Sequence, residues 1–182
     1  LLISMISIIL QGTPIFFFHE RLGKNAIVFT MIKFRTMTNE PSKSAEHDIT
    51  RLTHWGRFLR KTSIDELPVL LNVIMGDMSL VGPRPLPTKY LHRFNSSQKQ
   101  RMSVKPGITG LAQVNGRNHL SWEQRFNYDI DYINKKSFFL DLFIIIKTLY
   151  FVIFRKNVSG KSQEIMSEFV GTKANKDDIL KK

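Results

Sequence analysis

Ser63-Ile64-Asp65-Glu66-Leu67-Pro68 places two adjacent carboxylates at the junction of two segments with helical hydrophobic spacing. The segment before it, residues 49–61, alternates apolar side chains with arginine and lysine, which predicts a basic amphipathic helix. Such a helix suits an anionic lipid surface and equally the surface of a soluble core. The segment after it, residues 67–75, predicts an apolar helix that Gly76 ends. We therefore expect both carboxylates at the start of a helix.

This junction has a structural and a chemical interpretation. In the first, Ser63 and Glu66 form a capping box, or Asp65 is the N-cap residue with Pro68 at the third helical position, where no intrahelical N–H is lost. In the second, the helix N-terminus keeps a carboxylate ionised and attracts phosphate. One carboxylate would then attack phosphorus, its neighbour would hold Mg²⁺, and Arg60 and Lys61 would stabilise charge on the transferring group. Taken alone, the junction favours the structural interpretation.

The rest of the chain predicts an α+β fold that is mostly α, in which amphipathic surface helices accompany a small β-hairpin. β-branched and aromatic residues on both sides of Gly23 predict that hairpin over about residues 15–35. The Gly-Pro-Arg-Pro segment 82–85 has to be extended. The elements expected further on are a polar helix over residues 86–101, a turn at 106–110 that leads into a strand over 111–114, a helix with a capping box at 121–124, and an interfacial or core helix over 137–154.

The charge of the chain predicts an anionic partner. Twenty-seven Lys and Arg oppose 15 Asp and Glu, which gives a formal net charge of +12. Fourteen Phe residues favour a membrane surface as this partner. A nucleic-acid-binding module is the alternative, but it requires a clustered basic face with stacking aromatics, and here the basic residues are dispersed.

Other reaction templates do not match the sequence. There is no cysteine, which excludes a disulfide framework and a zinc-thiolate site. Gly160-Lys161-Ser162 matches only the end of a P-loop, because position 155 is Arg155 and not glycine. The five histidines lack the spacing of a zinc-protease motif, and no nucleophile elbow is present.

Several segments, in this order along the chain, resemble the bacterial sugar transferases, and more narrowly the small monotopic phosphoglycosyl transferases. Each motif is weak alone, but the ordered set is specific, and the resemblance extends from about residue 12 to residue 160. The segments are Lys-Phe-Arg-Thr-Met at 33–37, Ile-Asp-Glu-Leu-Pro at 64–68, and the stretches 72–79, 81–85 and 105–117.

The resemblance implies a reaction and residues that perform it. A sugar-1-phosphate would pass from a UDP-sugar to polyprenol (undecaprenyl) phosphate, and UMP would be released, as the first membrane step of bacterial polysaccharide or glycoprotein glycan assembly. Asp65 would attack the β-phosphate and carry a covalent phosphosugar intermediate. Glu66 would be the second catalytic residue and would bind Mg²⁺, with Asp129 as a further metal ligand. The substrate-binding arginines would be Arg60, Arg84 and Arg117.

The resemblance also implies a location at the cytoplasmic face of the bacterial inner (cytoplasmic) membrane, in contact with anionic inner-membrane lipid. Residues 1–12 would be the tail end of a re-entrant membrane helix, residues 13–172 the catalytic domain and residues 173–182 a charged tail. The family's Ser-Pro break does not appear before Leu10, so we expect the entering half of that helix to be missing. A nucleic-acid partner is not expected. A catalytically silent membrane-surface scaffold is the other alternative, and the intact Asp-Glu pair argues against it.

Overall fold

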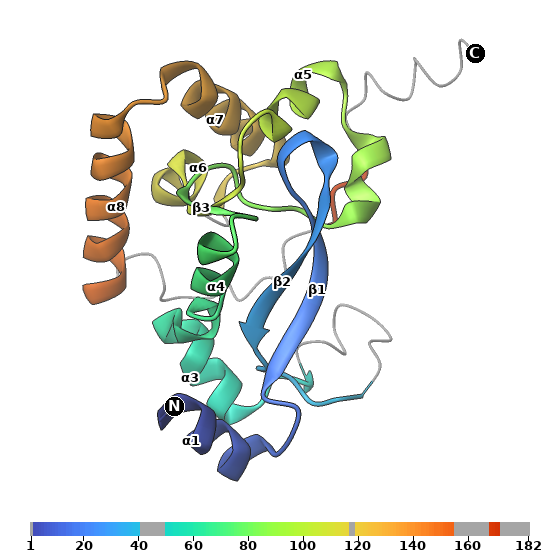
Figure 1. The fold of residues 1–182 in the computed structure, drawn as a ribbon, viewed down its shortest axis with the longest axis vertical. Helices are drawn as coiled ribbons and strands as arrows, with labels where there is room; N and C mark the ends of the chain where they lie inside the picture. Colours follow the sequence, from blue (N-terminus) through green and yellow to red (C-terminus); the bar gives the residue numbers. More distant parts are fainter. Residues whose placement is uncertain (1, 41–49, 117–118, 155–167, 172–182) are drawn as a thin grey trace.

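A long antiparallel hairpin lies at the centre of the fold in the computed structural model, which describes residues 2–40, 50–116, 119–154 and 168–171. Strand β1 (Phe16–Leu22) pairs with β2 (Val28–Phe34) along the length of both strands. The hairpin runs along the long axis of the molecule in Figure 1. It confirms the hairpin predicted over residues 15–35.

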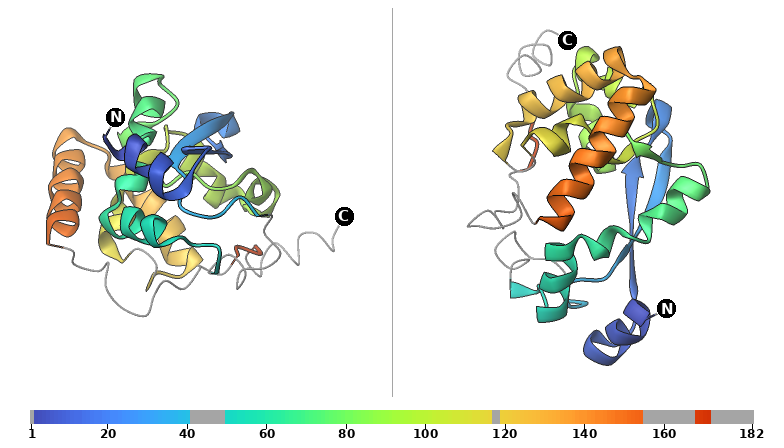
Figure 2. Two further views of the ribbon diagram at one scale, coloured as in Figure 1. Left: turned by 90° about the horizontal axis from the view of Figure 1, so that it is seen from below. Right: turned by 90° about the vertical axis from the view of Figure 1, so that its left-hand side faces the viewer.

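Helices surround this hairpin and make the described part of the chain mostly helical, as predicted. α1 lies at one end of the molecule and α7 at the other, while α8 lies along one side (Figures 1 and 2). Short 3₁₀ segments occupy Lys24–Ala26, Ile64–Glu66, Thr88–Arg93 and Gln100–Met102. The α-helices are α1 (Leu2–Gln11), α3 (His54–Thr62), α4 (Val69–Ile74), α5 (Ser96–Lys99), α6 (Leu111–Asn115), α7 (Trp122–Lys135) and α8 (Phe138–Ile153).

Helix α3 is shorter than the helix predicted over residues 49–61. Its N-cap is Thr53, whose side chain accepts a hydrogen bond from the Gly56 N–H, so the helix begins at His54. Leu52 instead forms an isolated bridge with Met37. The apolar helix α4 confirms the prediction for residues 67–75 in its central part.

Two predictions further along the chain are wrong. The polar helix expected over residues 86–101 breaks at Phe94, which is extended, because Asn95 caps α5 through a capping box with Gln98. The strand expected over residues 111–114 is helix α6, and the residues before it form β4 (Gly107–Thr109). β4 pairs in parallel with β3 (Ser79–Val81).

Glycines explain the position of this parallel pair. A Cβ added at Gly107 would lie 2.1 Å from the backbone nitrogen of Gly82, so the two segments meet at a distance that only glycine permits.

The capping box predicted at residues 121–124 is confirmed, since Ser121 and Gln124 make both of its hydrogen bonds at the start of α7.

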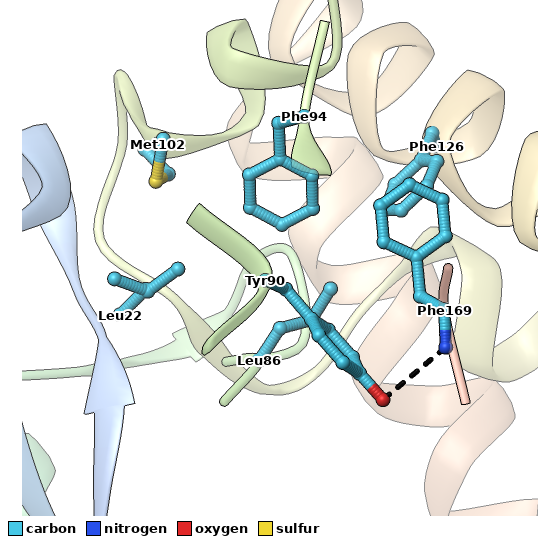
Figure 3. Close-up of a cluster of buried hydrophobic side chains, with 7 residues drawn as sticks. All are labelled: Leu22, Leu86, Tyr90, Phe94, Met102, Phe126 and Phe169. Atoms are coloured by element: carbon cyan, nitrogen blue, oxygen red, sulfur yellow. Dashed lines mark hydrogen bonds between the residues drawn. The ribbon is translucent and has the colours of Figure 1, made fainter. Parts of the chain in front are cut away.

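A buried cluster of mainly aromatic side chains fixes the chain that follows the Gly-Pro-Arg-Pro segment (Figure 3). It joins β1, the 3₁₀ segment Thr88–Arg93 and α7. The Tyr90 hydroxyl accepts a hydrogen bond from the Phe169 N–H at 3.3 Å. The members are Leu22, Leu86, Tyr90, Phe94, Met102, Phe126 and Phe169.

The predicted membrane segment is helical, as α1. In the part of the chain that the structure describes, no helix combines the length and apolar character needed to cross a bilayer. That α1 is the remnant of a re-entrant membrane helix stays a prediction. The predicted charged tail, residues 173–182, lies outside the described residues.

Candidate active site

The two carboxylates lie in the 3₁₀ segment Ile64–Glu66, which joins α3 to α4. The chain turns sharply before them because Ser63 adopts a left-handed conformation with φ 58° and ends α3. Both structural interpretations of the junction are wrong. Ser63 makes no side-chain capping bond, and the N-cap of α4 is Pro68, not Asp65. The carboxylates are therefore available for other contacts.

Glu66 lies between two cations from distant parts of the chain. Its Oε1 accepts hydrogen bonds from Lys33 Nζ at 2.6 Å and from Arg84 Nη2 at 2.9 Å. Lys33 comes from β2, and Arg84 from the extended segment after β3. Burial alone would raise the pKa of Glu66, but the charges of Arg84 and Lys33 prevail and hold it well below its usual range. Glu66 is therefore ionised at neutral pH.

Asp65 has the opposite electrostatic environment. Burial, and then the negative charge of Glu66, raise the pKa of Asp65 above its ordinary value, while Lys33, Arg60 and Arg84 oppose that rise. Among the described residues no cation forms an ion pair with Asp65, in contrast to the two that Glu66 binds. Its carboxylate is thus open to a ligand.

The structure brings two of the three predicted substrate-binding arginines to this pair of carboxylates. Arg60 lies on the last turn of α3, where its Nε donates to Thr36 Oγ1 at 3.0 Å. Arg84 has a side chain that is 44% exposed, and Glu66 raises its pKa. Arg117 lies outside the described residues. Substrate binding by these arginines stays a prediction.

Asp129 is buried in α7 and bound to another arginine. Its Oδ2 accepts from Arg101 Nε at 3.0 Å and from Arg101 Nη2 at 2.7 Å. Arg101 Nη2 also donates to the backbone oxygen of Arg84 at 2.7 Å. Asp129 therefore acts on the site through Arg101 and the segment that carries Arg84, and its role as a metal ligand stays a prediction.

Two functional candidates escaped the sequence reasoning. Lys33 belongs to the Lys-Phe-Arg-Thr-Met motif, which by itself indicates no role for it, and the structure places it on Glu66. Arg101 was expected at the end of a polar helix and is instead 4% exposed in the interior. A local pattern could have drawn attention to the first, whereas no local signal marks the second.

A family model described as bacterial sugar transferase matches residues 1–155 of this chain. The chain belongs to the bacterial sugar transferase family. The match includes the Asp65–Glu66 pair and the segments that carry Lys33, Arg60 and Arg84.

Relatives of this bacterial sugar transferase share its sequence over most of the chain. EpsL of Bacillus subtilis (strain 168), an uncharacterized sugar transferase, is 47% identical over 163 residues, which cover 88% of this chain and 81% of EpsL. The galactosyl transferase CpsE of Streptococcus agalactiae serotype III (strain NEM316) is 40% identical over 159 residues, 79% of this chain and 35% of CpsE.

A third relative has a name that states a reaction. The UDP-glucose:undecaprenyl-phosphate glucose-1-phosphate transferase of Xanthomonas campestris pv. campestris is 40% identical over 156 residues, 79% of this chain and 32% of that protein. The sugar transferase chain thus spans about a third of the length of these last two relatives.

The Asp65 and Glu66 carboxylates suit Mg²⁺ better than they suit a metal ion whose ligands all come from the protein. No group of three His, Asp or Glu side chains in the described residues could hold a metal ion. Mg²⁺, however, is commonly held by one or two carboxylates together with waters and substrate phosphates. Both ion pairs of Glu66 fall on Oε1, which leaves Oε2, with Asp65 beside it, for such an ion. In Asp129, by comparison, Oδ2 is already bound twice by Arg101.

Proposed function

We propose that this sugar transferase moves a sugar-1-phosphate from a UDP-sugar to polyprenol (undecaprenyl) phosphate and releases UMP. The observation that carries the proposal is the open Asp65 carboxylate beside a Glu66 that two cations keep ionised. The name of the Xanthomonas relative, which states this donor type and this acceptor, supports it.

The first step forms a covalent intermediate on Asp65. A carboxylate oxygen of Asp65 attacks the β-phosphorus of the donor, the bond from that phosphorus to the bridging oxygen breaks, and UMP leaves with both bonding electrons. Lys33 and Arg84 keep positive charge next to the incoming diphosphate, and the charge of Arg60, which also acts on Asp65, adds to it. Mg²⁺, when held by Asp65 and Glu66, supplies further neutralisation of the diphosphate.

The second step transfers the phosphosugar to the lipid. An oxygen of polyprenol phosphate attacks the same phosphorus, the bond from that phosphorus to the Asp65 oxygen breaks, and a polyprenol diphosphate sugar is formed. Asp65 returns to its carboxylate form, so the enzyme is ready for another donor.

The proposed acceptor is a lipid, and the surface of the protein supports action at the cytoplasmic face of the bacterial inner membrane. The sequence of α8 includes two charges that argue against a membrane span, and the structure turns both toward the protein. Asp141 accepts from the Tyr132 hydroxyl at 2.8 Å, and Lys147 donates to Asn115 Oδ1 at 2.9 Å. The outward face of α8 is left apolar.

Apolar exposure continues on other helices. In α8 the exposed fraction reaches 79% at Phe139, and in α4 it reaches 81% at Ile74. Soluble monomers rarely expose large contiguous apolar patches, whereas anionic-lipid surfaces bind basic chains with such faces. The exposed apolar side chains include Leu2, Met5 and Ile9 in α1, Leu70, Leu71 and Ile74 in α4, and Phe138, Phe139, Phe143, Ile146 and Ile153 in α8.

The proposed reaction is tested by UMP release from a panel of UDP-sugars, with the membrane-bound full-length protein, undecaprenyl phosphate and Mg²⁺. We expect release with at least one sugar, and Asp65→Asn should abolish it with folding retained. Asp131→Asn, which removes an exposed carboxylate of α7, is the matched control and should keep full activity. Unchanged transfer by Asp65→Asn would refute Asp65 as the nucleophile.

The same assay tests whether the reaction requires Mg²⁺. Excess chelator should stop turnover, because the diphosphate loses its charge neutralisation. Full activity in chelator would refute the assignment of Mg²⁺ to the pair of carboxylates.

A further inference from the structure

Two polar side chains of β1 lie on the same face of the hairpin as Lys33. Residues directly opposite each other in an antiparallel pair share a face, and Lys33 is opposite Phe17. His19 and Arg21 follow Phe17 at intervals of two, so they continue along this face. The hairpin therefore presents three basic side chains in a row toward the site.

The segment that carries Arg84 lies beside this row. The Leu22 N–H donates to Leu86 O at 3.0 Å, and Arg21 forms an isolated bridge with Pro87. The extended Gly-Pro-Arg-Pro segment thus runs next to the end of β1. The guanidinium of Arg21 is brought close enough to Arg84 that the Arg84 charge lowers its pKa.

The charged groups are ordered along the site. Arg60 donates to Thr36, two residues after the end of β2, and Glu66 binds Lys33, the next-to-last residue of β2. Arg21 is opposite Phe29, which lies four residues further along β2 from Thr36 than Lys33 does. Along the hairpin the order is therefore Arg60, the ion pair of Glu66 with Lys33, and Arg21.

Arg21 is placed where a cation is unfavourable without an anionic ligand. Burial, and then the charge of Arg84, lower the pKa of Arg21 to about 10. The carboxylate that acts on it, Glu66, already binds Lys33 and Arg84 through Oε1. Two guanidinium groups close together in a partly desolvated site repel each other, and a bound anion removes that cost.

His19 holds the Arg21 side chain in this place. Arg21 Nε lies 3.4 Å from His19 Nε2, and Arg21 Nη2 lies 3.2 Å from His19 Nδ1. Burial, followed by the charges of Arg21, Lys33 and Arg84, lowers the pKa of His19 to about 3. The imidazole is therefore neutral at pH 7, and it can accept from the guanidinium without adding positive charge.

We propose that Arg21, positioned by His19, binds the α-phosphate of the UDP-sugar donor, which leaves as part of UMP. The proposal rests on the reaction proposed above and deepens it. In-line attack by Asp65 on the β-phosphorus places the leaving phosphate on the far side of that atom. Along the hairpin Arg21 lies beyond Lys33, on the side away from Thr36 and Arg60, which suits the leaving phosphate. Negative charge grows on the α-phosphate as UMP departs, so a cation there stabilises the transition state more than the bound donor.

The test compares two inhibitors of the full-length, membrane-bound enzyme. UMP has the phosphate and uridine lacks it, so only UMP should depend on Arg21. We expect Arg21→Gln to raise the inhibition constant of UMP roughly 10- to 100-fold, the range for a lost hydrogen bond to a charged group. Uridine inhibition should change by less than about twofold. Lys24→Gln removes an exposed charge from the same hairpin and is the matched control.

The half-reactions separate binding of the leaving group from general damage. Arg21→Gln should slow single-turnover UMP release, whereas transfer from preformed phosphosugar enzyme to polyprenol phosphate should keep its rate, because UMP has already left. Equal weakening of UMP and uridine, or an unchanged inhibition constant for UMP, would overturn the proposal. If Arg21→Gln does not fold, Arg21→Lys is used, and an intermediate inhibition constant for UMP is expected.

His19 is tested as a positioning residue. His19→Ala should weaken UMP but not uridine, and His19→Gln, which keeps an acceptor, should restore part of the UMP affinity. An absence of turnover by the wild-type enzyme with every donor would refute the proposed reaction alone. In that case direct calorimetric titration of UMP into wild type and Arg21→Gln decides the subsite, because it requires no turnover.

Discussion

Replacement of Asp129 by asparagine should cost the protein much of its stability. The Asp129 carboxylate and the Arg101 guanidinium are buried together, with side chains 5% and 4% exposed, and two hydrogen bonds join them at 3.0 and 2.7 Å. Removal of one partner from a buried ion pair leaves an uncompensated charge and costs about 3–5 kcal/mol. For a chain of this size that loss corresponds to a decrease in Tm of roughly 6–20 °C.

The assay is thermal denaturation of wild type and Asp129→Asn in the same detergent. The double variant Arg101→Met/Asp129→Leu removes both charges and should recover most of the lost Tm, since no buried charge is left unpaired. A Tm for Asp129→Asn within about 2 °C of wild type would refute the assignment of a structural ion pair.

The same variant separates this role from the metal role predicted for Asp129. If Asp129 were a Mg²⁺ ligand, Asp129→Asn would raise the Mg²⁺ concentration that gives half-maximal activity. If it serves Arg101, that concentration stays the same, while activity falls because Arg101 no longer holds the Arg84 backbone oxygen at 2.7 Å. Asp129→Asn therefore distinguishes the two roles: a structural ion pair predicts a lower Tm with an unchanged Mg²⁺ dependence, and a metal ligand predicts a higher Mg²⁺ requirement.

Two further predictions follow from the Asp65–Glu66 pair and from α3. Burial and Glu66 raise the pKa of Asp65, and attack requires its carboxylate form. In a pH profile, kcat/KM should therefore be full at high pH and fall as the pH decreases through a pKa above the ordinary 3.8. An acid limb at or below 3.8 would contradict this. Gly56→Ala should destabilise α3 by at least about 1–3 kcal/mol in denaturant unfolding, because its Cβ would lie 1.9 Å from Thr36 O, and a wild-type midpoint would contradict that contact.

Local patterns in the sequence predicted the elements whose causes are local. The hairpin follows from the β-branched and aromatic residues on both sides of Gly23, and the start of α7 follows from the capping box at Ser121. The break in the helix expected over residues 86–101 was missed because Asn95 reads as one more polar residue in a polar segment. Its spacing to Gln98 matches a capping box, but no hydrophobic run follows that would mark a helix start, and the hydrogen bonds between the two residues show the cap.

The site could be predicted in part. The adjacent carboxylates and Arg60 are close in sequence, so a motif could draw attention to them together. The ion pairs that lower the pKa of Glu66 join elements far apart, since Lys33 is 33 residues from Glu66 and Arg84 is 18. Periodicity within one segment has no information about such partners. The parallel pairing of β3 with β4 was missed for the same reason.

Because Glu66 Oε1 binds both Lys33 and Arg84, selection can act differently on Glu66 and on Asp65. Catalytic groups are often kept at the expense of stability, so their loss stabilises the protein. Asp65 fits that rule, because its charge is disfavoured by burial and by its neighbour. Glu66 does not, because its removal would leave Lys33 and Arg84 facing each other without a counter-ion. A sequence drifting toward robustness can discard the first carboxylate, but the second is retained by folding as well as by chemistry.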